Sequence, residues 1–389
     1  MNNTDKPVIV VICGDPGGTS AVIPVIKKIL SEKKVRIRAF AYREAGRIME
    51  KNHVPFFPAD EDMDLRQIRQ SFEEARVSFL LTGTSYNQVD LEKKFIQVAK
   101  EMVVPSIAIL DFWSNYSARF SDAEGVIRYI PDKIAIMDET VRSDMIQEGF
   151  NPESLVVTGQ PAFDGLEAVI SQFNCHKKTE ILAHLGIHPG ELVVSFFSQP
   201  LSKIYGSDKS NPRFLGFSES TVLQLLITSL KKISAEGKQE IYLIVRPHPR
   251  EDSSNYKQFE YPGSKVLVPR MYDSREIALA SDLVTGMNTE LLVEACYMGC
   301  LVASLQPGLR FKDCLPTNKM GYSIPVYSEA QMDGTIRTAL MDPDFRSDMT
   351  NKLDHFRPDG HATDKIVRLV YQMIGITTDI GDYHGKTGN

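Results

Sequence analysis

Residues 282–308, DLVTGMNTELLVEACYMGCLVASLQPG, restrict the folds open to this chain more than any other stretch. Apolar runs at both ends of the stretch predict strands, and Gly286 ends the first of them. Asn288 or Thr289 can then cap a helix between the two strands. Such a strand–turn–helix–strand unit belongs to a parallel sheet with helices on its faces. The free backbone N–H groups at the start of the helix, with their partial positive charge, suit a phosphate group.

The same alternation of strands and helices runs through most of the remaining sequence. Val8–Cys13 is a continuous apolar run, which is typical of a buried parallel strand, and a helical pattern over Ala21–Leu30 follows it. After a helical and more polar stretch over residues 165–190, the pattern starts again with an apolar strand over Leu192–Phe197. We therefore predict an α/β fold with two doubly wound parallel sheets.

The length of the chain also favours two hydrophobic cores. At 389 residues, the chain exceeds the size at which a single core stops growing. With 42% hydrophobic and 24% charged residues, it has the composition of a globular protein. The predicted parts are an N-terminal Rossmann-like domain (1–165), an inter-domain segment (166–190), a C-terminal Rossmann-like domain (191–358), a closing helix (359–375) and a tail (376–389).

Charge and cysteine content exclude several classes of function. The net charge of −6 argues against a general nucleic-acid-binding protein, which needs a basic surface, but it allows a single nucleotide site. The five cysteines are scattered and odd in number, which favours reduced thiols, and no Cys/His cluster completes a metal site. The sequence shows no signal peptide and no apolar run near the ~20 residues of a membrane helix. We expect a cytoplasmic protein without a metal or cofactor, which could visit the inner face of the membrane.

The unusual polar residues of the sequence follow the ends of predicted strands. In open α/β sheets, ligands bind beyond the carboxyl ends of the strands. The segments are GDPGG (14–18), TGTSYN (82–87) and DFWSNYSARF (111–120) in the first half, and SQP (198–200), RPHPRE (246–251) and GMNTE (286–290) in the second. Two domains with polar strand ends predict a binding cleft between them.

The first of these segments, GDPGG, has two interpretations. It lacks the G-x-G-x-x-G of dinucleotide-binding folds and the Gly-Lys-Ser/Thr of a P-loop. Gly17 and Gly18 could simply let a helix pack closely on the sheet. They could equally let a sugar or phosphate approach the backbone, with Asp15 as a hydroxyl ligand or a base.

Asp111 ends a predicted buried strand and precedes the only tryptophan of the chain, Trp113. An aromatic residue beside polar groups is typical of carbohydrate stacking sites, and a buried carboxylate can serve as a general base. In the alternative interpretation, Asp111 caps a helix and the aromatic residues belong to the core.

RPHPRE is a more specific signal. Pro247 and Pro249 stiffen the segment that carries His248, directly after a predicted strand. Arg246 and His248 can therefore donate hydrogen bonds to a diphosphate. The alternative is a surface turn whose charges are merely solvated.

Glu290 and Glu294 lie four residues apart on the helix of the 282–308 stretch. Such pairs usually form a solvated face, but this helix follows a buried strand. We predict that Glu294 binds ribose hydroxyls when a phosphate lies at the start of the helix. Glu290 is assigned only to the electrostatics of the helix N-terminus.

Together, these motifs resemble the GT-B superfamily. Within it, the chain is similar to the branch that contains UDP-N-acetylglucosamine 2-epimerases and capsule-type and CDP-glycerol-type transferases. The matching features are the glycine turn after the first strand, TGQPAFD (158–164) before the inter-domain segment, the His248–Pro249 pair, the turn at Asn288–Thr289 and Glu294. TGQPAFD matches the T-G-N-P of the branch with Gln160 in place of Asn, and the closing stretch resembles the helix that crosses back to the N-terminal domain.

The chain also departs from the epimerases of this branch. They usually carry a Gly-Thr-Arg-Pro-Glu-like first loop, a Ser-Gly-Gly turn and a His-x-Glu-Ala-Gly segment. Here these become GDPGG, MNT and ILDFWSNY. The differences favour a transferase with its own acceptor over an epimerase.

The resemblance implies two Rossmann-like domains facing across a cleft, and a UDP- or CMP-linked sugar as the donor. It implies a metal-independent glycosyltransferase of cell-surface polysaccharide or glycoconjugate synthesis, with the nucleotide in the C-terminal domain. The implied roles are Ser198 and Gln199 on phosphate, Arg246 and His248 on the diphosphate, Gly286, Asn288 and Thr289 at the helix N-terminus, Glu294 on ribose, and Asp111 or Asp15 as base. A 2-epimerase and a non-catalytic nucleotide-sugar-binding protein stay open as alternatives, as do the acceptor, membrane-linked ones included, and a homodimer.

Overall fold

The structure is a computed structural model that describes residues 6–85, 89–237, 239–260, 264–266, 272–354, 356 and 359–377. It confirms the predicted α/β class with two parallel sheets. The described residues form two compact units. Unit 1 comprises the residues up to Asp164 and from Asp359 onwards, and unit 2 comprises those in between. In the described parts of the chain, no helix has both the length and the apolar character needed to span a membrane.

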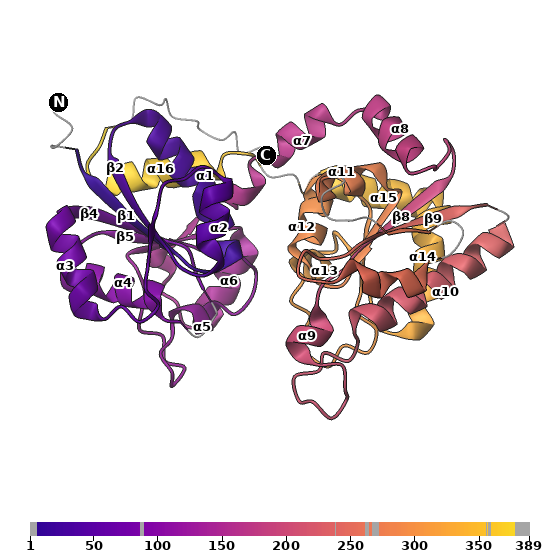
Figure 1. The fold of residues 1–389 in the computed structure, drawn as a ribbon, viewed down its shortest axis with the longest axis horizontal. Helices are drawn as coiled ribbons and strands as arrows, with labels where there is room; N and C mark the ends of the chain where they lie inside the picture. The colour runs from indigo at the N-terminus through magenta and orange to yellow at the C-terminus, as the bar shows by residue number, and fades with distance from the viewer. Residues whose placement is uncertain are drawn as a thin grey trace. The chain divides into compact units, whose positions relative to one another are not determined.

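Among its described residues, unit 1 has a seven-stranded parallel sheet in the order β3-β2-β1-β4-β5-β6-β7. Figure 1 labels β1, β2, β4 and β5 of this sheet. Its strands are β1 (Val8–Cys13), β2 (Arg36–Ala41), β3 (Phe57–Pro58), β4 (Val77–Thr82), β5 (Ser106–Ile109), β6 (Lys133–Ile136) and β7 (Leu155–Val157). Its helices are α1 (Pro16–Glu32), α2 (Glu44–Lys51), α3 (Leu65–Ala75), α4 (Leu91–Glu101), α5 (Tyr116–Phe120), α6 (Glu139–Gln147) and α16 (Ala362–Met373), with 3₁₀ turns at Pro152–Ser154 and Pro161–Phe163. The strand order reverses beside β1, so the loops after β1 and β4 flank the switch point where ligands bind in such sheets.

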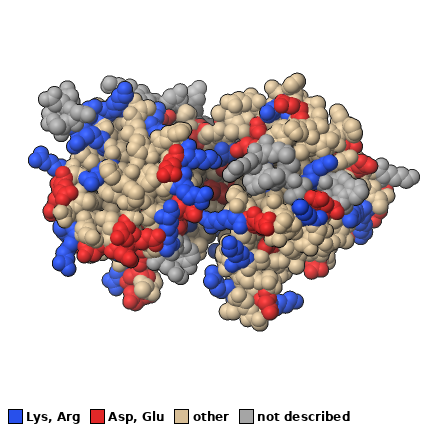
Figure 2. All heavy atoms as spheres, viewed as in Figure 1, with Lys and Arg blue, Asp and Glu red and all other residues tan. Residues whose placement is uncertain are grey.

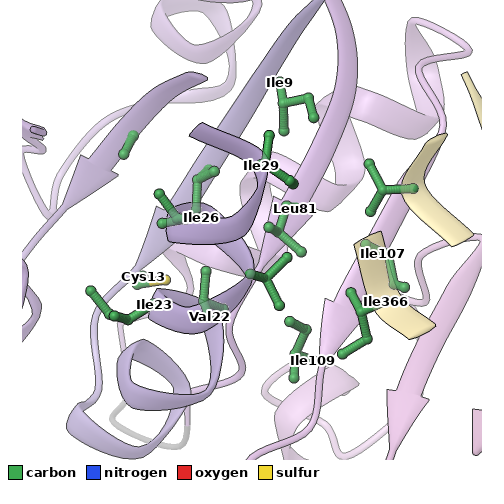
Figure 3. Close-up of a cluster of buried hydrophobic side chains, with 14 of the residues drawn as sticks. Ile9, Cys13, Val22, Ile23, Ile26, Ile29, Leu81, Ile107, Ile109 and Ile366 are labelled. Carbon is green, nitrogen blue, oxygen red and sulfur yellow. The ribbon is translucent and has the colours of Figure 1, made fainter. Parts of the chain in front are cut away.

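β1 lies at the centre of the hydrophobic core of unit 1. All of its residues are buried, as its continuous apolar sequence predicted. Ile9 of β1 packs in one cluster with Val22 and Ile26 of α1 (Figure 3). Ile366 of α16 belongs to the same cluster, so this late helix completes the first core (Figures 1 and 3).

Residues 158–164, TGQPAFD, hold α16 on unit 1. The carboxylate of Asp164 accepts hydrogen bonds from the backbone N–H groups of Ala362, at 3.0 Å, and Thr363, at 2.6 Å. Gly159 has a φ of 90°, and a Cβ at this position would lie 3.1 Å from the Cβ of Ala362. A larger residue would therefore be strained and would crowd the helix. The motif therefore caps the N-terminus of α16 and lets this helix pack closely on unit 1.

Among its described residues, unit 2 has a six-stranded parallel sheet in the order β10-β9-β8-β11-β12-β13. Figure 1 labels β8 and β9 of this sheet. Its strands are β8 (Leu192–Phe197), β9 (Ile241–Arg246), β10 (Ser264–Val266), β11 (Leu283–Gly286), β12 (Val302–Leu305) and β13 (Ile324–Val326). Its helices are α7 (Leu166–Gln172), α8 (Cys175–His184), α9 (Leu201–Tyr205), α10 (Glu219–Gly237), α11 (Ser274–Ala280), α12 (Glu290–Tyr297), α13 (Pro316–Met320), α14 (Glu329–Met341) and α15 (Pro343–Asp354), with a 3₁₀ helix at Ser253–Phe259. The predicted strand–turn–helix–strand unit is confirmed as β11, α12 and β12, with Thr289 at the N-cap.

Two strands predicted from apolar runs, Val8–Cys13 and Leu192–Phe197, have these same bounds in the structure. The prediction for the first helix was wrong at its start, because α1 begins at Pro16 and not at Ala21. Proline fits the first turn of a helix, and Asp15 takes the N-cap position. The helices α5, α9 and α13 were not predicted, since five residues are too few to show a helical period.

Candidate functional site

A cavity of about 500 Å³ lies at the carboxyl ends of β8 and β9 in unit 2. Its described lining residues come from the ends of these strands and from the starts of α11 and α12. They are Phe197, Ser198, Arg246, Pro247, His248, Pro249, Tyr272, Asp273, Ser274, Thr289 and Leu291. The structure thus brings four predicted substrate-binding residues, Ser198, Arg246, His248 and Thr289, to one cavity. Its volume is in the range of small-molecule sites, about 300–1,000 Å³.

Arg246 places a buried positive charge on the wall of this cavity. It is the last residue of β9 and is only 6% exposed. Burial lowers the pKa of its guanidinium, and the carboxylate of Asp273 opposes that shift. The arginine stays protonated at neutral pH. An anionic ligand would offset part of the cost of burying this charge.

His248 presents a hydrogen-bond donor to the same cavity. Its Nδ1 accepts a hydrogen bond from the backbone N–H of Arg250 at 3.1 Å, so the proton of the neutral ring sits on Nε2. Burial, and then the charge of Arg250, lower the pKa of His248. A neutral imidazole with an Nε2–H group can donate to a phosphate oxygen without carrying a charge.

Ser198 belongs to a buried network that sequence analysis did not identify. Its Oγ lies 2.5 Å from the phenolic oxygen of Tyr256 and donates to Glu251 Oε1 at 3.2 Å. Tyr256 also donates to Glu251 Oε1, at 2.6 Å. Burial raises the pKa of the Glu251 carboxyl, and the hydrogen bonds from Tyr256, the His248 backbone and Ser198 oppose the shift. Glu251 belongs to the RPHPRE segment, but its contact with Tyr256 could not be predicted, because the contact produces no periodic pattern in the sequence.

A hydrogen bond to the segment that follows β8 fixes the turn before α12. Gln199 Oε1 accepts a hydrogen bond from the backbone N–H of Asn288 at 3.0 Å. A Cβ at Gly286 would lie 3.0 Å from the carbonyl oxygen of Phe197, so glycine permits the close approach of β11 to the end of β8. Thr289 Oγ1 accepts from the backbone N–H of Leu291 at the start of α12. Gln199 and Gly286 therefore position the turn that carries Asn288 and Thr289.

Glu294 forms a bidentate ion pair with Arg275 of α11. The two hydrogen bonds measure 2.8 Å, from Nε, and 2.6 Å, from Nη2. The ionised carboxylate has lone pairs left to accept ribose hydroxyls, so its predicted role stays a prediction. Sequence analysis missed Arg275 because it lies 19 positions before its partner, a spacing without any local meaning.

In unit 1, the glycines of GDPGG lie against other parts of the protein. A Cβ at Gly17 would lie 2.1 Å from Asp111 Oδ2, and a Cβ at Gly18 would lie 2.7 Å from the carbonyl oxygen of Thr84. This is the close packing of the first interpretation, in which the glycines let a helix approach the sheet. Asp15 is the N-cap residue of α1.

Asp111 is 8% exposed and is held by a cation. Its Oδ1 accepts from Arg119 Nη1 at 2.6 Å and from Thr84 Oγ1 at 2.9 Å, and its backbone oxygen accepts from Gln160 Nε2. Protonation of Oδ1 would leave the buried guanidinium without its counter-charge. The role of Asp111 as a base therefore stays a prediction. Taking up a proton in that role would cost the energy of leaving the buried guanidinium unpaired.

The interpretation of Trp113 as a carbohydrate-stacking residue was wrong. The indole is only 7% exposed and is stacked on Phe163, with ring centroids 6.2 Å apart. Its Nε1 donates a hydrogen bond to Asp138 Oδ2 at 2.6 Å. The aromatic residue is part of the core, as in the alternative interpretation.

Glu92 is a buried carboxylate near the same sheet edge that sequence analysis missed. It is 4% exposed and accepts hydrogen bonds from Tyr42 and from Ser85, both at 2.5 Å. Burial raises the pKa of Glu92 to about 7, against the effect of the two hydroxyl groups. The surrounding sequence, LEKKF, has the charge pattern of a solvated helix face, so nothing in it indicated burial.

On the face shown in Figure 2, Lys and Arg side chains are interspersed with Asp and Glu side chains among the described residues. Within the described residues, no three His, Cys, Asp or Glu side chains are grouped to hold a metal ion.

Comparisons with other proteins support the fold. No protein-family model matches the sequence, and no curated protein matches it. Among solved structures, the Neisseria meningitidis UDP-GlcNAc 2-epimerase bound to UDP-GlcNAc has a TM-score of 0.68 at 12% identity, over 94% of this chain and 100% of that one.

Two further structures are similar over nearly the whole chain. Staphylococcus aureus MnaA with UDP has a TM-score of 0.69 at 14% identity, over 96% of this chain and 100% of that one. A glycosyltransferase from Rickettsia africae has a TM-score of 0.62 at 10% identity, over 96% of this chain and 100% of that one. The chain therefore has the GT-B fold with two Rossmann-like domains, as its resemblance to that superfamily implied.

Proposed function

We propose that this protein is an enzyme that transfers a sugar from a nucleoside diphosphate donor to a hydroxyl-bearing acceptor. The observation that carries the proposal is the convergence of Arg246, His248 and Thr289 on one cavity in unit 2. The buried guanidinium, the Nε2–H group and the start of α12 all attract negative charge. A diphosphate is the ligand that such a set of donors fits best.

UDP-linked sugars are the first donors to test. The N. meningitidis epimerase holds UDP-GlcNAc and S. aureus MnaA holds UDP, both on a similar fold. A CMP-linked sugar is the second choice, because the donors around the cavity favour phosphate and do not select a base.

The same donors would assist the chemical step. When the bond between the sugar and the diphosphate breaks, negative charge grows on the leaving diphosphate. Arg246, His248 Nε2–H and the N-terminus of α12 would stabilise this charge from fixed positions. Ser198, Gln199 and Asn288 would hold the phosphate side of the donor, and Glu294 the ribose.

A 2-epimerase acting on the same donor is the second candidate, since the similar structure from N. meningitidis is a UDP-GlcNAc 2-epimerase. The two functions differ in what they need. An epimerase converts its donor alone, whereas a transferase releases UDP only when an acceptor, or slowly water, takes the sugar.

The test is calorimetric titration of the full chain with UDP and with CMP, followed by proton NMR of UDP-GlcNAc incubated with the protein, with and without added sugars and polyols. We expect UDP to bind, and UDP release to be faster with an acceptor. Conversion of UDP-GlcNAc to its 2-epimer without an acceptor would establish the second candidate. Absence of UDP and CMP binding would refute both candidates.

A further inference from the structure

Three oxygen atoms at the wall of the cavity in unit 2 form a short chain that leads away from the cavity. Ser198, whose side chain is on the wall, has its Oγ 2.5 Å from the phenolic oxygen of Tyr256. This phenolic oxygen lies 2.6 Å from Glu251 Oε1. Both hydroxyl-bearing residues are buried, at 5% exposure for Ser198 and 3% for Tyr256. Oxygen atoms at such distances share a proton in a hydrogen bond.

The second oxygen of the Glu251 carboxylate has a fixed role. Oε2 accepts a hydrogen bond from the backbone N–H of His248 at 2.7 Å. A backbone N–H always donates, so Oε2 must accept. Any proton on this carboxyl group therefore sits on Oε1, the oxygen that faces Tyr256. Ser198 Oγ also lies within reach of Oε1, at 3.2 Å.

Without a ligand, the two hydroxyl protons are enough for this chain. Tyr256 donates its proton to Glu251, and Ser198 directs its proton toward Tyr256 and Glu251. Ser198 then has only lone pairs left for the cavity. A phosphate oxygen is also an acceptor, so it cannot bind to Ser198 while the serine proton points into the protein.

A phosphate oxygen bound to Ser198 raises the number of protons that the chain needs from two to three. One proton is then needed between each pair of neighbouring oxygens, from the ligand through Ser198 and Tyr256 to Glu251. A proton on Glu251 Oε1 meets this need, because Glu251 then donates to Tyr256, Tyr256 to Ser198 and Ser198 to the ligand. Without it, one pair of close oxygen atoms would have no proton between them, which is costly in a buried site.

We infer that binding of a diphosphate in the cavity of unit 2 is coupled to the uptake of one proton by Glu251 Oε1, through the hydroxyl groups of Tyr256 and Ser198. This inference rests on the diphosphate site proposed above. The proton comes from solvent, and no other bond forms or breaks. Since the complex holds one proton more than its free components, affinity falls as pH rises, by up to about tenfold per pH unit.

The groups around Glu251 act on its protonation in opposite directions. Burial, and more weakly the charge of Glu219 on α10, raise the pKa of Glu251. The hydrogen bonds from Tyr256, the backbone of His248 and Ser198 oppose this shift. An anionic ligand would act as Glu219 does, so it would raise the pKa further. The other group of the cavity that could take up a proton is the His248 ring, whose pKa is lowered by burial and by the charge of Arg250.

The test is calorimetric titration of the full chain with UDP and with inorganic diphosphate in buffers that differ in ionisation enthalpy. The dependence of the binding enthalpy on that of the buffer gives the number of protons taken up. Titrations from about pH 5 to pH 8 should show a maximal uptake of about one proton in the wild type. Protonation of the ligand itself is the same for all variants and cancels when they are compared.

Glu251→Gln is the decisive variant, because its amide imitates the protonated carboxyl group. The amide oxygen would accept from the His248 backbone, which turns the amide nitrogen toward Tyr256 as a permanent donor. The variant should bind UDP at least as tightly as the wild type at the upper end of the pH range, but without the additional proton uptake. Tyr256→Phe interrupts the chain and should lose this uptake too. Glu260→Gln, at an exposed glutamate after the same 3₁₀ helix, should match the wild type.

Several results would overturn the coupling. They are equal proton uptake in Glu251→Gln and wild type, full uptake in Tyr256→Phe, and an uptake that disappears in His248→Asn but persists in Glu251→Gln. Melting curves identify any variant that does not fold, and Glu251→Gln decides alone if Tyr256→Phe is unfolded. Binding without proton uptake in the wild type overturns the coupling but leaves the proposed function intact. A wild type that binds neither UDP nor inorganic diphosphate overturns the diphosphate site itself, and the coupling with it.

Discussion

Replacement of Arg246 by glutamine should weaken UDP binding far more than replacement of Arg250. Both changes remove one positive charge from the RPHPRE segment (246–251), but Arg246 is 6% exposed, whereas Arg250 is exposed. Two unit charges about 4 Å apart interact by about 4 kcal/mol at an effective dielectric constant of ~20, and by about 1 kcal/mol in bulk water. After desolvation, a charge-assisted hydrogen bond contributes about 1.5–3 kcal/mol. We therefore expect the Kd for UDP to rise about 10- to 150-fold in Arg246→Gln.

The exposed arginine should contribute much less. Exposed ion pairs are worth about 0–1 kcal/mol, which corresponds to a change in Kd of about fivefold at most. Salt offers a second distinction, because screening acts strongly on exposed charges and weakly on buried ones. Calorimetric titrations at low salt and at about 0.5 M salt should show a persistent defect in Arg246→Gln and a vanishing one in Arg250→Gln.

Equal effects of the two substitutions would refute the reasoning, because burial would then make no difference to the interaction. An unchanged Kd in both variants would place the nucleotide away from β9. A melting curve is needed for each variant, since Arg246 is buried at the end of a central strand. A stable Arg246→Gln protein with weakened UDP binding is the expected result.

Three further outcomes follow from the structure. Asp164→Ala should destabilise unit 1 by about 1–2 kcal/mol in urea denaturation, because two backbone N–H groups of α16 lose their cap. The control, Glu167→Ala at an exposed site, should leave the stability unchanged. Glu294→Gln should weaken binding of UDP more than binding of inorganic diphosphate in parallel titrations, and equal losses would contradict the ribose assignment. The pKa of Glu92 rises from 4.5 to about 7 on folding, so the native state binds more protons than the unfolded state between these pH values and stability falls as pH rises through them. Glu92→Gln should remove this decline in stability, which is about 3 kcal/mol in total. A stability profile of the variant parallel to that of wild type would disprove the raised pKa of Glu92.

The fold could be predicted from the sequence because its signals are local. Each buried parallel strand is a short apolar run, as in Val8–Cys13, and each is followed by turn residues and a helical pattern. Thr289 could be placed at the start of α12 because threonine before an apolar helix is a capping signal. The same logic placed Ser198, Arg246 and His248 at strand ends, and these residues do meet at one cavity.

The residues that sequence analysis missed depend on contacts between distant segments. Arg275 reaches Glu294 across two helices, and Tyr256 reaches Ser198 over 58 positions. Glu92 was not singled out because the sequence around it, LEKKF, has the charge pattern of a solvated face, whereas packing buries its carboxylate against Tyr42 and Ser85. The interpretation of Trp113 was wrong for the opposite reason. Its polar neighbours suggested a carbohydrate-stacking site, but its ring packs in the core against Phe163.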